Sequence, residues 1–139
     1  MRRLLLVLAT SVISGCLSPL PAVDPQMAWI DFSTPTPGGK LLMAERLDNR
    51  RVNDGRYYQV TPGSHELLVR FDFEVFGGPS GIMGEPVERL CYLTIKYDHF
   101  EAGQHYTLEG RSLTFDPSAR LYNDKREVVA EDRNVNCII

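Results

Sequence analysis

Hydrophobic and polar residues alternate with a period of two along most of the chain after its first 26 residues. The clearest stretch is residues 65–75, where one face is apolar and the other is charged except at Leu68. Strict alternation of this kind is typical of a half-buried antiparallel strand. Residues 27–32 and 87–97 alternate in the same way. The inward-facing side chains of the clearest stretch are expected to be His65, Leu67, Val69, Phe71, Phe73 and Val75.

Turn residues separate these stretches. Thr61-Pro62-Gly63-Ser64 has proline and glycine at its two central positions, which is the pattern of a type II turn. Residues 33–39, STPTPGG, break the chain again. The composition of residues 40–47 fits either a helix or a strand, but the segment is short and has no helix cap, so we predict a strand.

Residues 105–115 change phase part of the way along. Tyr106 and Leu108 alternate in one phase, whereas Leu113 and Phe115 alternate in the other. One extra residue near Gly110 would bring all four side chains to the same face. We therefore expect a β-bulge there.

The last predicted strands form a hairpin. Residues 119–123 and 128–131 flank the polar turn DKRE, and the tail NVNCII follows them. With about seven short strands, frequent turn signals and no convincing helix after the first segment, we predict an all-β fold. The expected architecture is an antiparallel β-sandwich of about seven strands, Ig-like or PEGA-like, over residues 27–139.

The first 15 residues follow a different pattern. Arg2 and Arg3 precede an apolar run from Leu4 to Ile13, and small residues follow this run. The run has ten residues, whereas a bilayer-spanning helix needs about 20. A basic start, a short apolar run and small residues predict a secretory signal peptide over residues 1–15. An ordinary secretory signal followed by a chance cysteine at position 16 is the alternative.

Ile13-Ser14-Gly15-Cys16 resembles the lipobox of bacterial lipoproteins. The resemblance implies that the chain is cleaved before Cys16 and that lipid is attached both to the Cys16 thiol and to the new amino group. Stable anchoring needs two or more acyl chains, and these two sites provide them. Lipoproteins of the inner membrane have Asp directly after the lipid-bearing cysteine. The residue at this position is Leu17, which resembles the sorting signal for the outer membrane of Gram-negative bacteria. The implied location is the periplasmic face of the outer membrane. Residues 16–26, which contain three prolines, are predicted to be a tether.

Cleavage would also change the charge of the chain. The mature chain loses Arg2 and Arg3 from the 15 basic residues and keeps all 18 acidic residues, so its net charge becomes −5. No basic stripe remains, which argues against a nucleic-acid partner. An acidic chain is not attracted to anionic lipids, so the acyl chains must provide the contact with the membrane.

Two cysteines remain after Cys16 is assigned to lipid. An exported domain favours disulfides, and Cys91 and Cys137 allow only one pairing within the chain. Cys91 lies on the apolar face of residues 87–97, where a bond to the tail would be shielded. A bridge with this separation would stabilise the fold by about 4 kcal/mol through chain entropy. Two free buried thiols are the alternative.

Two short motifs resemble those of a known family. Residues 60–71, VTPGSHELLVRF, resemble the signature of PEGA-type domains, which are small β-sandwich modules of bacterial envelope proteins. Residues 100–108, FEAGQHYTL, resemble the start of a strand in small bacterial lipoproteins. The Asp-Gly turn of the family reads Leu47-Asp48-Asn49 here, and Asn tolerates a positive φ. The resemblance covers residues 40–110 and implies a fold and an envelope location, with no catalytic residue.

Sequence patterns of enzymes are missing from the chain. Residues 77–86, GGPSGIMGEP, lack both the lysine of a phosphate-binding loop and the serine spacing of a nucleophile elbow. His65, His99 and His105 do not have the spacing of metal ligands. We therefore predict no catalytic residue, no metal and no cofactor, and we interpret Trp29 as a core residue rather than a binding aromatic.

Two functional hypotheses follow. The first is a binding or structural module, not an enzyme, that docks to another envelope protein or to the cell wall. Ile82 and Met83, at the tip of the loop of residues 77–86, are its predicted docking residues unless they fold back over the sandwich. The second is a small-ligand or metal-binding carrier, or an enzyme. It requires a pocket in which at least two of His65, His99, His105 and Asp98 lie within hydrogen-bonding reach.

Overall fold

The computed structural model describes residues 15, 18–77 and 84–138. These residues form nine strands, two more than the seven or so predicted, and no helix, as predicted. Cys16, Ile82 and Met83 lie outside the described residues. The strands are β1 (Ala28–Ser33), β2 (Gly39–Leu47), β3 (Arg50–Arg51), β4 (Tyr58–Val60), β5 (Gly63–Val75), β6 (Val87–Phe100), β7 (His105–Leu113), β8 (Asp116–Tyr122) and β9 (Val128–Ile138).

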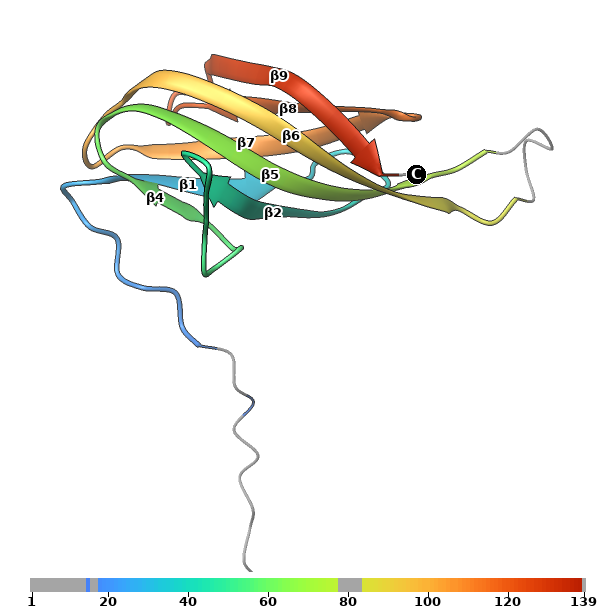
Figure 1. Ribbon diagram of the computed structural model, residues 1–139, viewed down its shortest axis with the longest axis horizontal. Helices are drawn as coiled ribbons and strands as arrows, with labels where there is room; N and C mark the ends of the chain where they lie inside the picture. The colour runs from blue at the N-terminus through green and yellow to red at the C-terminus, as the bar shows by residue number, and fades with distance from the viewer. Residues whose placement is uncertain (1–14, 16–17, 78–83, 139) are drawn as a thin grey trace, which may run out of the picture.

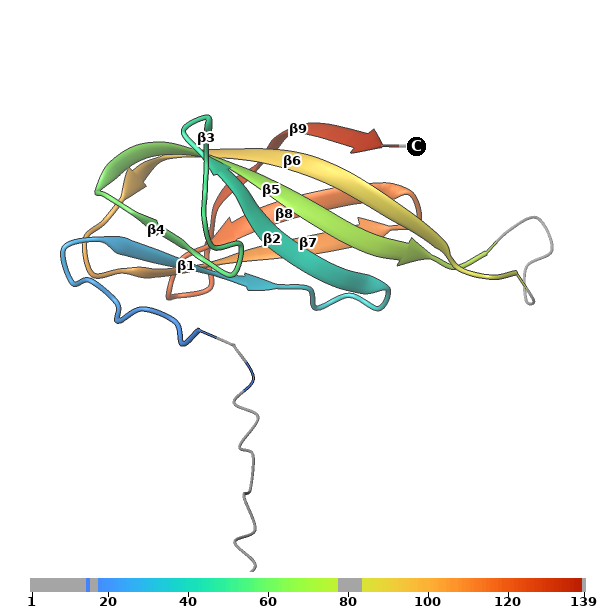
Figure 2. The ribbon, with the colours of Figure 1, turned by 60° about the horizontal axis from the view of Figure 1, so that its bottom comes forward.

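The strands are hydrogen-bonded in the order β3-β2-β5-β6-β9-β8-β7-β1-β4, and this continuous ladder folds over into two layers (Figures 1 and 2). One layer contains β2, β5 and β6, and the other contains β1, β7 and β8. Strand β9 belongs to both, because its first half pairs with β8 and its second half pairs with β6. The all-β, sandwich-like fold is confirmed.

One pair departs from the predicted antiparallel arrangement. Strand β1 pairs in parallel with β7, so that Trp29 lies beside His105 and Ser33 lies beside Glu109. The chain segment between them contains β2 to β6, which is long enough to return the chain in the same direction. All the other strand pairs are antiparallel.

The core lies between the two layers. The predicted inward face of β5 is buried from Leu67 to Val75, and Leu68 lies on the opposite, outer face. Strand β6 contributes Cys91, Leu93 and Ile95 to the same core. Because a strand points successive side chains to opposite faces, these two long strands alone supply much of the apolar interior.

The expected bulge near Gly110 is wrong. Strands β7 and β8 pair without a register shift from Thr107 to Leu113. Leu113 and Phe115 are 78% and 49% exposed. They do not have to share the buried face of Tyr106 and Leu108, so no bulge is needed. Gly110 instead serves close packing, because a Cβ atom there would lie 3.2 Å from the ring of Phe71 and 3.3 Å from Leu42.

The chain end is a strand rather than a loose tail. Cys137 on β9 lies opposite Cys91 on β6, and their Sγ atoms are 2.01 Å apart, which is the distance of a disulfide bond. Cys91 is buried. The pair therefore joins the last strand to the buried face of β6.

The two ends of the sandwich differ (Figure 1). At the tether end, the chain enters β1, and the turns β4–β5, β6–β7 and β8–β9 lie together. Part of the predicted tether lies against the fold here, because Arg56 donates a 2.9 Å hydrogen bond to the carbonyl of Ser18, and the N–H of Asp24 donates to Gln59. At the distal end lie the connections β1–β2, β5–β6 and β7–β8, together with the end of β9. The described segments contain no helix long and apolar enough to cross a membrane.

Candidate functional site

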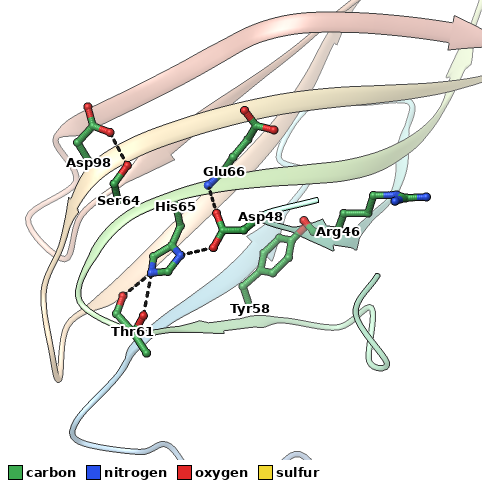
Figure 3. A network of polar contacts seen from close by, with 8 residues as sticks. All are labelled: Arg46, Asp48, Tyr58, Thr61, Ser64, His65, Glu66 and Asp98. Carbon is green, nitrogen blue, oxygen red and sulfur yellow. Dashed lines mark hydrogen bonds and ion pairs between the residues drawn. The ribbon is translucent and has the colours of Figure 1, made fainter. Parts of the chain in front are cut away.

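The most connected polar cluster surrounds the turn between β2 and β3 (Figure 3). Asp48 and Asn49 both have positive φ, at 47° and 65°, as a two-residue hairpin of type I′ requires. The Asp48 carboxylate reaches β5 from this turn. Its Oδ1 accepts a 2.8 Å hydrogen bond from the N–H of Glu66, and its Oδ2 lies 2.6 Å from Nδ1 of His65.

The ring of His65 continues this network to the next turn. Its Nε2 lies 2.7 Å from the carbonyl oxygen of Thr61 and 3.1 Å from the hydroxyl of the same residue (Figure 3). Both ring nitrogens therefore have polar partners, a carboxylate at Nδ1 and a carbonyl oxygen at Nε2. His65 thus connects the β2–β3 turn to the β4–β5 turn and has no nitrogen left for a ligand.

The electrostatics agree with a structural role for this cluster. Partial burial acts to raise the pKa of Asp48, but the hydrogen bonds from the Glu66 N–H and from His65 outweigh it and hold the pKa below its ordinary value. Asp48 therefore stays ionised and acts as an acceptor. Together with His65, it fastens a short hairpin onto the long strand β5.

Tyr58 fills the irregular part of β2 beside this cluster (Figure 3). The register of β2 against β5 shifts between Ala44 and Arg46. The buried Tyr58 hydroxyl accepts a 3.3 Å hydrogen bond from the N–H of Glu45, and it contacts the carbonyls of Arg46, at 2.9 Å, and of Leu68. A bulge leaves backbone groups unpaired, and this hydroxyl pairs them.

The remaining residues of the predicted ligand pocket do not assemble. Asp98 accepts a 2.6 Å hydrogen bond from Ser64, and Nδ1 of His105 lies 3.8 Å from Asp31. The ring of His99 packs edge-on against Tyr97. Within the described ranges, no two of His65, His99, His105 and Asp98 are bonded to each other, and no cluster of three or more His, Cys, Asp or Glu residues could hold a metal.

Trp29 is not available as a platform for a ligand. Its side chain is 3% exposed, stacks on Tyr57 with the ring centres 4.3 Å apart, and donates a 2.6 Å hydrogen bond to Asp31. It lies on the face of β1 opposite to Ile30, so it forms a small cover outside the main core. The prediction that Trp29 is buried is therefore confirmed, although it lies outside the main core cluster.

A second polar cluster was not anticipated from the sequence. Glu109 on β7 is 4% exposed on the outer face of the second layer. Its two carboxylate oxygens accept hydrogen bonds of 2.8 Å from Arg111 and 2.6 Å from Arg126. Burial acts to raise the pKa of Glu109, but the two guanidinium groups outweigh it and lower the pKa. The only sequence signal was an acidic residue with an arginine two positions later, on the same face of a strand.

Exposed apolar side chains gather at the distal end, in a group that we call the distal apolar rim. Phe76 and Val87, at the base of the β5–β6 connection, are 63% and 53% exposed. Phe115 lies near the same connection, because the guanidinium of Arg89 is 5.6 Å from the centre of its ring. The predicted docking residues Ile82 and Met83 belong to this connection, outside the described residues. The rim consists of Leu41, Phe76, Val87, Leu113, Phe115 and Ile138.

The distal apolar rim is thus the part of the described surface that most resembles a contact surface, whereas the two polar clusters hold turns in place.

Comparisons of the chain with protein-family models, curated proteins and solved structures found no match, and the resemblance to PEGA-type domains stays a prediction.

Proposed function

We propose that this protein is a lipid-anchored, periplasm-facing binding module of the bacterial outer membrane that docks to another envelope protein through its distal apolar rim. The lipobox-like sequence ending at Cys16 supports the anchor. The disulfide distance between Cys91 and Cys137 suits an oxidising compartment. The PEGA-like motifs agree with an envelope location.

The distal apolar rim carries the proposal. Scattered apolar side chains are normal on a protein surface, but grouped ones with polar surroundings mark contact sites. Most of the large exposed hydrophobic side chains of the described strands gather at this one end, and the chain enters the fold at the other end (Figure 1). A tether attached at the opposite end leaves the rim free to meet a partner.

The chemistry of the rim favours a protein over the glycan strands of the cell wall as the partner. Recognition of a glycan needs polar side chains that form hydrogen bonds with its hydroxyl groups, whereas Phe76, Val87 and Leu113 have no polar atoms in their side chains. Lys40 lies beside the rim and is already paired with Glu74 and Glu88, at 2.8 and 2.5 Å. The partner surface is therefore expected to be apolar.

The experiment compares two valines of similar exposure at opposite ends. Val87 at the distal end is 53% exposed and Val128 at the tether end is 46% exposed. Chemical crosslinking of the anchored protein in its native envelope, followed by purification, should give a defined crosslinked partner. Val87→Ser, combined with Phe76→Ser, should reduce the yield of that partner several-fold, whereas Val128→Ser should leave it unchanged.

All these variants should keep their free energy of unfolding within about 0.5 kcal/mol of the wild type, because the changed side chains are exposed. Ile82→Ser with Met83→Ser should act like the variants of the rim. The proposal is wrong if the distal and tether-end variants give equal crosslinking yields, or if no crosslinked partner forms with the wild type.

A further inference from the structure

The two layers separate between β8 and β9, and this leaves an opening in the ladder. Strand β9 pairs with β8 only as far as Glu131, opposite Arg120. From Asp132 onward β9 pairs with β6. In the part of the chain that the structure describes, no strand pairs with the other edge of β9 after Glu131.

The side of the opening formed by β8 is protected. The N–H of Ala119 donates a 2.8 Å hydrogen bond to the Asp132 side chain where the ladder ends. Pro117 lies two residues earlier, so it faces the same edge, and it has no N–H to offer. A carboxylate and a proline are two of the devices by which proteins prevent further strands from pairing with an edge.

The β9 edge faces the opening with free backbone groups. The Cα atoms of Cys91 and Cys137 are 4.0 Å apart, which is the spacing of a non-hydrogen-bonded antiparallel pair rather than of a bonded one. The N–H and C=O of Cys137 therefore point away from β6. Those of Val135, two residues earlier, point the same way.

This edge also lacks the usual protection by side chains. Residues 134–138, NVNCI, contain no charged residue and no proline. By contrast, β3 at one end of the ladder consists of Arg50 and Arg51, and β4 at the other end has only three residues and lies beside Asp24 of the tether. Natural proteins leave a neutral edge unprotected mainly where another strand is to pair with it.

We propose that a second copy of this chain pairs with this edge, β9 against β9 around a two-fold axis, to form a homodimer with one sheet continuous across both copies. An antiparallel edge is complementary to itself, because the two-fold axis brings each N–H opposite a C=O. The pairing covers Val135, which is exposed in the single chain. It also brings Asn134 and Asn136 of the two copies close enough to share hydrogen bonds.

The lack of charged side chains on this edge favours a second copy of the chain over a different strand that carries charges. Residues 134–138 offer no charged side chain with which to choose such a partner. The mature chain has a net charge of −5, but the two charged residues directly before this segment, Asp132 and Arg133, have opposite signs, and charges farther away are screened beyond about 8 Å in physiological salt. Two neutral edges can therefore approach each other without local repulsion.

The predicted tether permits this dimer on one membrane. Its 11 residues, 16–26, span at most about 40 Å when extended, and a two-fold axis along the membrane normal would place both tethers at the same height above one leaflet. Anchoring would raise the local concentration of the two copies. Only this last point depends on the proposed lipid anchor, because the pairing itself depends on the β9 edge alone.

The test measures the mass of the mature, lipidated protein by sedimentation equilibrium in density-matched detergent micelles. The wild type should form dimers at micromolar concentrations. Asn136→Lys puts like charges next to each other across the interface and should raise the dimer dissociation constant by at least about tenfold. Asn53→Lys makes the same change at an exposed position between β3 and β4 and should leave the constant unchanged.

Amide hydrogen exchange of the wild type gives a second readout that needs no variant. The amides of Val135 and Cys137 should become more protected as the protein concentration rises, whereas the amides of Asn134 and Asn136, which face β6, should change little. A protein that remains monomeric up to about 1 mM overturns the proposal. So does a dimer that Asn136→Lys does not weaken, or a dimer in which the exchange at Cys137 does not change with concentration.

Discussion

The Nη2 atom of Arg126 lies 2.6 Å from the Oε1 atom of Glu109, so a residue of the β8–β9 turn is bonded directly to a buried carboxylate on β7. Arg126 has a positive φ of 64°, and its guanidinium also covers the ring of Tyr122 at 4.4 Å. Arg111 binds the other oxygen of Glu109. The β8–β9 turn is thus fastened to β7, which is not one of the two strands that the turn connects.

Glu109→Gln should lower the free energy of unfolding by about 2 kcal/mol at pH 7, because hydrogen bonds between charged groups are lost and the amide nitrogen faces an arginine. Glu131→Gln is the matched control. Its ion pair with Arg120 is exposed on both sides, so its loss should cost less than about 1 kcal/mol. Urea unfolding monitored by the single tryptophan measures both variants. Equal losses would contradict the special role of Glu109.

The cost of Glu109→Gln should also depend on pH. The arginines hold the folded pKa of Glu109 below its ordinary value of 4.5, so the carboxylate contributes stability above that value and loses it as the pH falls through the folded pKa. The gap between wild type and variant should therefore be full at pH 7 and should shrink below about pH 4. A gap that stays constant from pH 7 to pH 3 would contradict this explanation.

Tyr58→Phe should destabilise the fold by about 1 to 3 kcal/mol, because the N–H of Glu45 and the carbonyls at the β2 bulge lose their partner. Tyr92→Phe removes a hydroxyl from the half-exposed outer face of β6 and should change stability by less than about 0.5 kcal/mol. Thermal unfolding separates the two variants. A mild effect of Tyr58→Phe would mean that water replaces the hydroxyl.

The cysteine pair makes a chemical prediction. Alkylation of the unreduced mature protein under denaturing conditions should modify neither Cys91 nor Cys137, and the same treatment after reduction should modify both, as mass spectrometry would show. Replacing both residues with Ala should lower the free energy of unfolding by about 4 kcal/mol, because the bridge closes a long loop. Two labelled thiols without reduction would mean that the bridge does not form.

The lipid anchor makes a separate prediction. Only a thiol can form the thioether to a diacylglyceryl group, so Cys16→Ser should leave an unprocessed precursor without fatty-acid label. Cys91→Ser should remain labelled and provides the control for a changed cysteine elsewhere. If the Cys16→Ser protein is labelled and matures normally, the lipoprotein interpretation is wrong.

The strands that could be predicted from the sequence are those with a complete local pattern. The alternation from Leu67 to Val75 identified the buried face of β5, and Asp48-Asn49 identified a turn with positive φ. Both features depend on neighbouring residues only. The predicted bulge at Gly110 is wrong. The change of phase in the sequence reflects the exposure of Leu113 and Phe115 and not an extra residue in the backbone.

The contacts that could not be predicted join residues far apart in the chain. Nothing near Ser33 or Glu109 indicates that their strands are parallel neighbours, because a strand's pattern specifies its faces and not its partners. The same limit applies to the pairing of Glu109 with Arg126, and to the opening beside β9. Each of these depends on how the whole ladder closes.

The route by which the chain enters β1 has a mechanical consequence. The predicted tether leads directly into β1, which lies between β4 and β7 and is paired with both. If a partner holds the distal end, tension in the tether pulls β1 along its own axis. The hydrogen bonds on both of its sides then share the force at the same time, instead of opening one after another. We therefore expect the domain to resist extraction forces in this direction better than forces that peel off an edge strand such as β3.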